Sequence, residues 1–262
     1  MTTTRWTKEQ LKLAFHLYCQ LPFGKLDMRT PEVILLASLI DRTSGAVAMK
    51  LSNFASLDPA ITGTGRKGLD GASNLDREVW AEFHADWEKL ALECFLLNAK
   101  LSQEKAADTM VKLDVDEQEG LQDFTGETKR VVTEQRIKQH FFRRAVLSSY
   151  RGRCCMSGLT DARLLMASHI VPWSIDKTNR LNPSNGLCLS AIHDKAFDRG
   201  LIALSDNYEV ILSEQIKRNT DALITQIFLP LEGCKIELPE KFIPNNEFIA
   251  RHRKDILVDA MC

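Results

Sequence analysis

Three residues between Ala167 and Gly200 have side chains whose chemistry suits the hydrolysis of a phosphodiester bond. His169 can accept a proton near neutral pH, because an unperturbed imidazole titrates at about pH 6.5. Asn185 carries an amide that can hydrogen-bond across a loop, and Asp194 offers the hard oxygen atoms that Mg²⁺ and Mn²⁺ prefer. A proton acceptor, a loop-fixing amide and a cation ligand so close in sequence predict a metal-dependent phosphodiester-cleaving site.

The surrounding sequence predicts a strand, a loop, a second strand and a helix, in that order. A strand over residues 164–170 places His169 near its end, before the loop-like run WSIDKTNRLNPS. The apolar run GLCL follows Asn185 and predicts the second strand. Ser190 can then cap a short helix that carries Asp194. The three chemical groups are therefore expected on three consecutive elements.

The motifs SHIVPW, NGLCL and HDKAFDRG, with a spacing of nine residues from Asn185 to Asp194, resemble those of HNH endonucleases, which have the ββα-metal fold. The resemblance covers about residues 145–215. It implies that His169 is the general base that takes a proton from the attacking water, and that Asn185 holds this base in position. It also implies that Asp194 binds one Mg²⁺ or Mn²⁺ ion, which polarises the phosphoryl group and stabilises charge on the leaving 3′ oxygen.

One position departs from the family pattern. Many members carry Asp directly before the general-base histidine, as a second metal ligand, whereas this chain has Ser168, a weaker and neutral ligand. The metal would then rely on Asp194, Ser168 and His193 together with water and substrate phosphate, although His193 could instead cap the helix. Asp198 is expected to be a structural hydrogen-bond acceptor near the site. Arg199 is expected either to contact phosphate or to be an ordinary surface residue.

The net charge of −1 hides two halves of opposite sign. Residues 1–128 carry 14 basic and 20 acidic side chains, and residues 129–262 carry 20 basic and 15 acidic ones. A helix is predicted from Thr133 to about Tyr150, with one apolar and one basic side. The basic side indicates contact with a nucleic-acid backbone, with a solvated helix face as the alternative. The DNA-contacting residues predicted on this helix are Arg136, His140, Arg143 and Arg144.

The N-terminal half has the pattern of a helical domain. Thr30 and Pro31 fit the N-cap and first position of a helix that ends near Ile40, and Thr43 or Ser44 fits the N-cap of the next. Two short helices joined by a polar turn predict a helix-turn-helix that could enter a DNA major groove, although any compact helical hairpin has this pattern. The DNA contacts predicted here are Lys50 and Asn53 on the second helix, and Arg66 and Lys67 in a glycine-containing loop that could equally be an ordinary surface loop.

A single amphipathic helix is predicted from Asp76 to Asn98, opened by a capping box of Ser73 and Asp76. The acidic stretch that follows is poor in large apolar residues and predicts a linker. We therefore expect an α+β protein. Its expected parts are a helical DNA-recognition domain at 1–101, an acidic linker at 102–128, and an HNH nuclease domain at 129–262 that begins with the basic helix.

Composition narrows the class of protein. Hydrophobic residues make up 44% and charged residues 26% of the chain, and no apolar run approaches the roughly 18 residues of a membrane span, so no membrane role is expected. The N-terminus MTTTRWTKEQ lacks the apolar segment of a secretory signal, so we expect a cytoplasmic protein with reduced cysteines. Cys154 and Cys155 are adjacent and Cys188 is isolated, so a structural zinc held by paired Cys-x-x-Cys motifs is not expected.

The function expected from these features is a metal-dependent DNA endonuclease, with restriction or defence against foreign DNA as the context that the resemblance implies. One such site cuts one strand, so double-strand cleavage would need a homodimer or two successive nicks. Two alternatives remain open. Ser168 would suit a DNA-binding regulator that kept the nuclease scaffold but lost catalysis, although His169, Asn185 and Asp194 oppose this. In the other, the N-terminal domain senses a ligand or protein and gates the nuclease.

Overall fold

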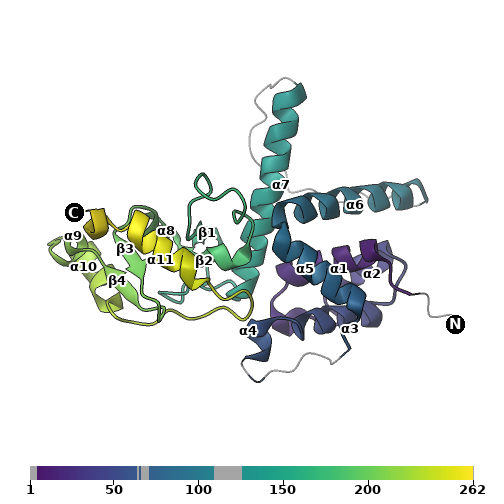
Figure 1. Cartoon of the computed structure of the whole chain (residues 1–262), viewed down its shortest axis with the longest axis horizontal. Helices are drawn as coiled ribbons and strands as arrows, with labels where there is room; N and C mark the ends of the chain where they lie inside the picture. The colour runs from purple at the N-terminus through teal and green to yellow at the C-terminus, as the bar shows by residue number, and fades with distance from the viewer. Residues whose placement is uncertain (1–4, 64, 66–70, 109–125, 262) are drawn as a thin grey trace. The chain divides into compact units, whose positions relative to one another are not determined.

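The fold, shown in Figure 1 as a computed structural model, is described for residues 5–63, 65, 71–108 and 126–261. Its residues group into two compact units. The N-terminal unit comprises Met1–Tyr18, Gly24–Leu57 and Lys67–Phe141, and the C-terminal unit comprises Cys19–Phe23, Asp58–Arg66 and Phe142–Cys262. The described part of the N-terminal unit is helical, while the strands lie in the C-terminal unit, which confirms the predicted α+β class.

Aromatic packing forms the core of the N-terminal unit. Phe15 lies 4.5 Å from Phe83, 5.0 Å from Phe54 and 6.2 Å from Trp87, measured between ring centroids. All four rings are buried, and rings of this size contribute much of the apolar area that a small helical core removes from water. The helices that carry or surround them are α1 (Lys8–Gln20), α2 (Pro31–Leu39), α3 (Ser44–Ala55), α5 (Asn74–Ala85) and α6 (Trp87–Asp108).

The predicted helix starts in this unit are confirmed. Thr30 is the N-cap of α2 with a proline in its first turn, and the Thr43 hydroxyl accepts a hydrogen bond from the first turn of α3. Ser73 and Asp76 form the predicted capping box of α5. The single helix predicted from 76 to 98 was wrong, because Asp86 has non-helical backbone angles (φ −152°, ψ 85°) and its carboxylate accepts from the Lys89 amide. Asp86 thus ends α5 and caps α6.

The predicted linker at 102–128 is helical at both of its edges. Residues up to Asp108 belong to α6, and α7 (Gly126–Ser149) begins before the predicted start at Thr133. The middle of the linker, 109–125, lies outside the described residues, as do Arg66 and Lys67 of the predicted basic loop.

The C-terminal unit contains the predicted strand, loop, strand and helix. Strand β1 (Leu165–His169) pairs antiparallel with β2 (Gly186–Ser190), so that His169 lies opposite Gly186. Helix α8 (Ala191–Asp198) packs on both strands, and the Ser190 hydroxyl caps it as predicted. Short 3-10 turns, Ala162–Leu164 and Pro183–Asn185, lead into the two strands.

Further elements pack around this hairpin and helix. The Gly200 backbone has a φ of 66°, and a Cβ atom there would lie 1.9 Å from the Ile256 carbonyl oxygen, so only glycine fits this turn after α8. Helix α11 (Asn246–Asp255) packs against β3 (Ile202–Leu204), as Figure 1 shows. The remaining elements of the unit are α4 (Pro59–Thr62), β3 (Ile202–Leu204), β4 (Val210–Leu212), α9 (Glu214–Lys217), α10 (Ala222–Phe228), η4 (Leu229–Leu231), α11 (Asn246–Asp255) and η5 (Val258–Met261). Among the helices described, none has the length and apolar character needed to cross a membrane.

Candidate active site

His169, the last residue of β1, is held on two sides by aromatic rings and on a third by a backbone carbonyl. Its ring lies parallel to Phe142 of α7, with centroids 3.9 Å apart, and edge-on to Trp173 at 5.5 Å. The His169 Nε2 atom is 2.8 Å from the Arg180 carbonyl oxygen. Because a carbonyl can only accept a hydrogen bond, Nε2 carries the hydrogen and the lone pair of the neutral ring is on Nδ1.

The environment of His169 favours the neutral ring. Burial lowers the pKa of His169 below its usual value, and the hydrogen bond to the Arg180 carbonyl opposes this only in part. A lowered pKa means that the imidazole is unprotonated at pH 7, the state in which Nδ1 can accept a proton. The ring is only partly buried, so it retains some contact with solvent.

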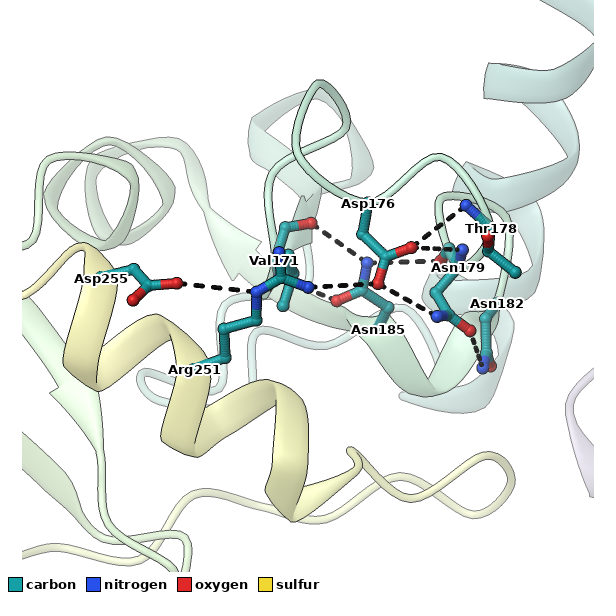
Figure 2. A network of polar contacts seen from close by, with 8 residues as sticks. All are labelled: Val171, Asp176, Thr178, Asn179, Asn182, Asn185, Arg251 and Asp255. Atoms are coloured by element: carbon teal, nitrogen blue, oxygen red, sulfur yellow. Dashed lines mark hydrogen bonds and ion pairs between the residues drawn. The ribbon is translucent and has the colours of Figure 1, made fainter.

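Asn185 joins the two ends of the loop between β1 and β2 (Figure 2). Its side-chain oxygen accepts from the Val171 amide at 2.8 Å, and its Nδ2 donates to the carbonyl oxygens of Val171 at 3.1 Å and Asn179 at 3.3 Å. Asn185 is buried, so these hydrogen bonds satisfy polar atoms that water does not reach. They fix the loop backbone at Val171 and at Asn179. Asn179 directly precedes Arg180, whose carbonyl accepts a hydrogen bond from His169.

Asp194 on α8 lies beside Ser168, the residue before His169. Burial raises the pKa of the Asp194 carboxyl, while the Ser168 hydroxyl and Lys195 lower it. Ser168 is 2% exposed, and its hydroxyl has no hydrogen-bond partner at bonding geometry among the described residues. Burial also raises the pKa of Asp198, and the charge of Asp194 raises it further. Two carboxylates one helical turn apart and an unpaired hydroxyl together offer oxygen atoms to a cation, whose charge would favour the ionised carboxyls.

The His193 ring lies in the core of the unit rather than with Asp194 and Ser168. It is 2% exposed, its Nδ1 is 3.5 Å from the Cys154 sulfur, and it meets Phe228 edge-on at 5.6 Å. Burial alone would raise the pKa of Cys154, but hydrogen bonds from His193 and Ser157 lower it to about 6. The predicted metal ligands are thus separated by the structure. Within the described part of the chain, no group of three His, Cys, Asp or Glu side chains could hold a metal ion.

The residues predicted to contact DNA on α7 differ in their surroundings. Arg143 donates to the carbonyl oxygens of Leu165, at 2.8 Å, and Ala162, at 3.2 Å. These bonds hold the start of β1, so this partly exposed guanidinium has a structural role, and its predicted contact with DNA stays a prediction. The other predicted basic contacts in these parts of the chain have exposed side chains, namely Arg136, His140 and Arg144 on α7 and Arg199 after α8.

The predicted contacts on α3 point to internal partners. Lys50 forms an ion pair with the fully buried Asp76 at 2.8 Å, and Asn53, which is 6% exposed, donates to the Gly71 carbonyl at 3.3 Å. Amphipathic spacing correctly placed both residues off the apolar stripe, but it could not show that neighbouring segments occupy them. The expectation that they are available on the helix surface was therefore wrong.

Sequence reasoning missed several residues that shape this site. Asp176 and Arg251 join the loop to α11, and Phe142 was expected only as part of an apolar helix side. The run Asp176-Lys-Thr-Asn contains a recognisable signal, because an aspartate followed by polar residues often accepts hydrogen bonds from amides two and three positions ahead. Arg251 has no comparable signal, since it lies 75 residues away in sequence.

Comparison with known proteins assigns the region that contains these elements. The family model for HNH endonucleases matches residues 154–205, a segment that includes β1, β2, α8 and β3. No curated protein matches the chain significantly. The C-terminal half thus contains an HNH endonuclease domain, as its three motifs predicted, and this domain indicates nuclease activity on nucleic acid. HNH nucleases usually use a divalent metal ion.

Proposed function

Starting from the HNH endonuclease domain at residues 154–205, we propose that this chain is a metal-dependent DNA endonuclease. The observation that carries the proposal is the 2.8 Å hydrogen bond from His169 Nε2 to the Arg180 carbonyl. It assigns the ring hydrogen to Nε2 and leaves Nδ1 as the basic atom. A neutral, held imidazole that directly follows Ser168, the neighbour of Asp194, suits the hydrolysis of a phosphodiester.

His169 acts as the general base. Its Nδ1 takes a proton from a water molecule as the water oxygen attacks phosphorus, and the bond from phosphorus to the 3′ oxygen breaks. Asn185 keeps the loop closed, so that the Arg180 carbonyl stays on Nε2 and the ring keeps its orientation. Positioning of this kind matters because a displacement of about 1 Å can cost about 100-fold in rate.

Asp194 and Ser168 would hold one Mg²⁺ or Mn²⁺ ion, with Asp198 one helical turn further along α8 as a structural residue near the site. The fit rests on the buried Ser168 hydroxyl, which lies beside the Asp194 carboxyl and makes no hydrogen bond of normal geometry within the described residues, and on the spacing of Asp194 and Asp198 by one helical turn. When bound, such an ion stabilises negative charge on the scissile phosphate and the leaving oxygen. His193 is not in this set, because its ring contacts Cys154 and Phe228.

Plasmid nicking tests the mechanism. Wild-type protein is expected to nick supercoiled DNA with Mg²⁺ or Mn²⁺ and to stop when EDTA is added. His169→Ala should lose this cleavage while keeping its fold and its affinity for DNA, as measured by circular dichroism and by mobility shift. Full activity of His169→Ala would refute the mechanism. Preferential cleavage of an RNA of matched sequence would show that RNA, and not DNA, is the substrate.

Ser168 also favours a second candidate, a DNA-binding regulator on a nuclease scaffold. A neutral hydroxyl stands where many HNH proteins have a carboxylate, so the cation would be held weakly. Under this alternative the wild type binds DNA without cutting it, and Ser168→Asp, which supplies the carboxylate, gains metal-dependent nicking. Nicking by the wild type at low millimolar Mg²⁺ would exclude the alternative.

The wider roles belong to the same proposal. We assign residues 1–101 to DNA recognition, from their helix-turn-helix pattern, and 129–262 to the nuclease part. The context of restriction or defence against foreign DNA is implied by the resemblance to HNH endonucleases. The exposed side chains of Arg136, Arg144 and Arg199 suit phosphate contacts. A plasmid assay separates the two modes of cutting. A homodimer that cuts both strands should linearise the plasmid directly, whereas a single-strand cutter should nick it first and linearise it slowly. Plaque counts of phage on cells with and without the active protein test the defence role.

A further inference from the structure

The Asp176 carboxylate organises the loop that faces His169. Its Oδ1 atom accepts from the backbone amides of Thr178, at 3.1 Å, and Asn179, at 3.0 Å. Its Oδ2 atom accepts from the Asn179 side-chain amide at 3.0 Å (Figure 2). The Asp176 side chain is only 14% exposed. One carboxylate therefore fixes two consecutive amides and the side chain of Asn179.

Asn179 is the link from this carboxylate to the candidate base. Its carbonyl oxygen accepts from the Asn185 side chain at 3.3 Å and from the Asn182 amide at 3.1 Å. The next carbonyl along the chain is that of Arg180, which accepts from His169 Nε2. The segment 178–180 is thus held by Asp176 on one side and Asn185 on the other, which sets the direction of the Arg180 carbonyl.

Arg251 ties the same carboxylate to helix α11. Its Nη1 atom is 3.4 Å from Asp176 Oδ2, and its Nε is 3.6 Å from Asp255 (Figure 2). The Arg251 side chain is more than a third exposed, so solvent screens this ion pair and its contribution is small. The amide hydrogen bonds of Asp176 are therefore the stronger constraint, and Arg251 is an additional tie from a distant part of the sequence.

We propose that Asp176 is a positioning residue for His169, which acts by folding residues 178–180 so that the Arg180 carbonyl holds the Nε2 hydrogen, and that Arg251 supports it from α11. The inference rests on the proposed function, since it concerns the same histidine. Asp176 touches neither water nor phosphate in this role. Its effect is to keep the ring in one tautomer and one orientation, with Nδ1 as the atom that accepts the proton.

Matched variants of the full chain test this role. Asp176→Ala removes the acceptor, whereas Asp176→Asn keeps a side-chain oxygen for the two backbone amides. Asp221→Ala is the control, because Asp221 also accepts from two backbone amides, those of Leu223 and Ile224 at the start of α10. Long-range ¹H–¹⁵N correlation spectra of the folded, metal-free proteins report the His169 tautomer, and cleavage of a defined oligonucleotide gives kcat and KM.

Asp176→Ala is expected to lower kcat by about 10- to 100-fold with little change in KM, and to turn the single His169 tautomer into a mixture. Asp176→Asn should restore most of kcat and the single tautomer, Arg251→Ala should cause a smaller loss, and Asp221→Ala should change neither. A folded Asp176→Ala protein with the wild-type tautomer would overturn the inference, whatever its activity. If the wild type cuts no nucleic acid, the proposed function fails, and the tautomer of Asp176→Ala still decides this inference by itself.

Discussion

Two histidines of the C-terminal unit make the same kinds of contact and differ in how far they are exposed. His169 lies on Phe142 with centroids 3.9 Å apart and planes 7° apart, and His252 lies on Phe197 at 3.7 Å and 8°. Both place Nε2 against a carbonyl oxygen, that of Arg180 at 2.8 Å and that of Phe197 at 3.1 Å. His252 is 2% exposed, and its Nδ1 is buried with no hydrogen-bond partner among the residues that the structure describes, while His169 is partly exposed.

This difference shows that ring stacking and a carbonyl partner do not by themselves make a histidine catalytic. The same packing holds a ring in one orientation in both regions. At His252 the second nitrogen is buried in the core, so the ring has a structural role, through its stacking on Phe197 and its hydrogen bond to the Phe197 carbonyl. His169 is partly exposed, so a ring held in the same way can serve proton transfer. Exposure of the histidine is the property that we expect to separate the two roles.

The largest expected effect comes from removing each ring in turn. His169→Ala should lower kcat for DNA cleavage by about 100- to 10,000-fold, because the general base is lost. His252→Ala should leave kcat per folded molecule near that of the wild type and lower the free energy of unfolding by about 1 to 3 kcal/mol, because the buried ring stacked on Phe197 and its hydrogen bond to the Phe197 carbonyl are both lost. Urea unfolding and single-turnover cleavage measure the two quantities.

The two histidines do not have different roles if both variants change the same quantity, either kcat or the free energy of unfolding alone. A loss of kcat in folded His252→Ala would mean that α11 affects the chemistry directly. Equal destabilisation by both variants, with cleavage retained, would mean that both rings are structural.

The pH dependence of stability gives a second, smaller test of the difference between His252 and His169. Burial lowers the pKa of His252 to about 4, against an ordinary value near 6.5. Above pH 6.5 the ring is neutral in both the folded and the unfolded state, and between pH 6.5 and 4 only the unfolded state gains the proton. The free energy of unfolding therefore falls as the pH is lowered through this window, by on the order of 3 kcal/mol in all.

His252→Phe keeps an aromatic ring and removes the titration, so it isolates this contribution. The free energy of unfolding is measured in urea from pH 4 to 8 for both proteins. The wild-type value minus the variant value should fall as the pH is lowered, because only the wild type loses the contribution of His252. Other groups such as Asp194 titrate equally in both proteins and cancel in the difference. A difference that does not change with pH would show that His252 is not held neutral by burial.

Much of this site could be predicted because its parts are local in sequence. Antiparallel pairing, the Ser190 cap and the three motifs depend on residues a few positions apart, and the structure has them as expected. The side-chain partners could not be predicted in this way. Helical spacing indicated a polar side of α7, but only the fold shows that Arg143 is bound to the Leu165 and Ala162 carbonyls. His193 stood next to Asp194 in sequence, and helical geometry turns its ring towards Cys154.

The smallest expected effect is that of Gly186→Ala. This variant tests whether the stacking of Phe142 on His169 depends on close packing between β2 and α7. A Cβ atom at Gly186 would lie 2.4 Å from the Val146 Cγ2 atom and 3.0 Å from the Phe142 ring. Gly186 has a φ of −131°, which alanine also adopts, so Gly186→Ala acts mainly by displacing these side chains, with a lesser contact of 3.2 Å to the Pro183 carbonyl oxygen. It should cost about 1 to 3 kcal/mol of stability through overpacking.

Because Phe142 carries the His169 ring, the same change should also lower kcat, whereas His252 and its stacking on Phe197 should be unaffected. Gly24→Ala is the matched control, since a Cβ atom at Gly24 meets no atom within 4 Å. Chemical shifts of the two histidine rings in both variants, together with kcat, measure the outcome. If Gly186→Ala shifts neither the His169 resonances nor kcat, the ring is held by its carbonyl and by Trp173 alone, and Phe142 serves only as core packing.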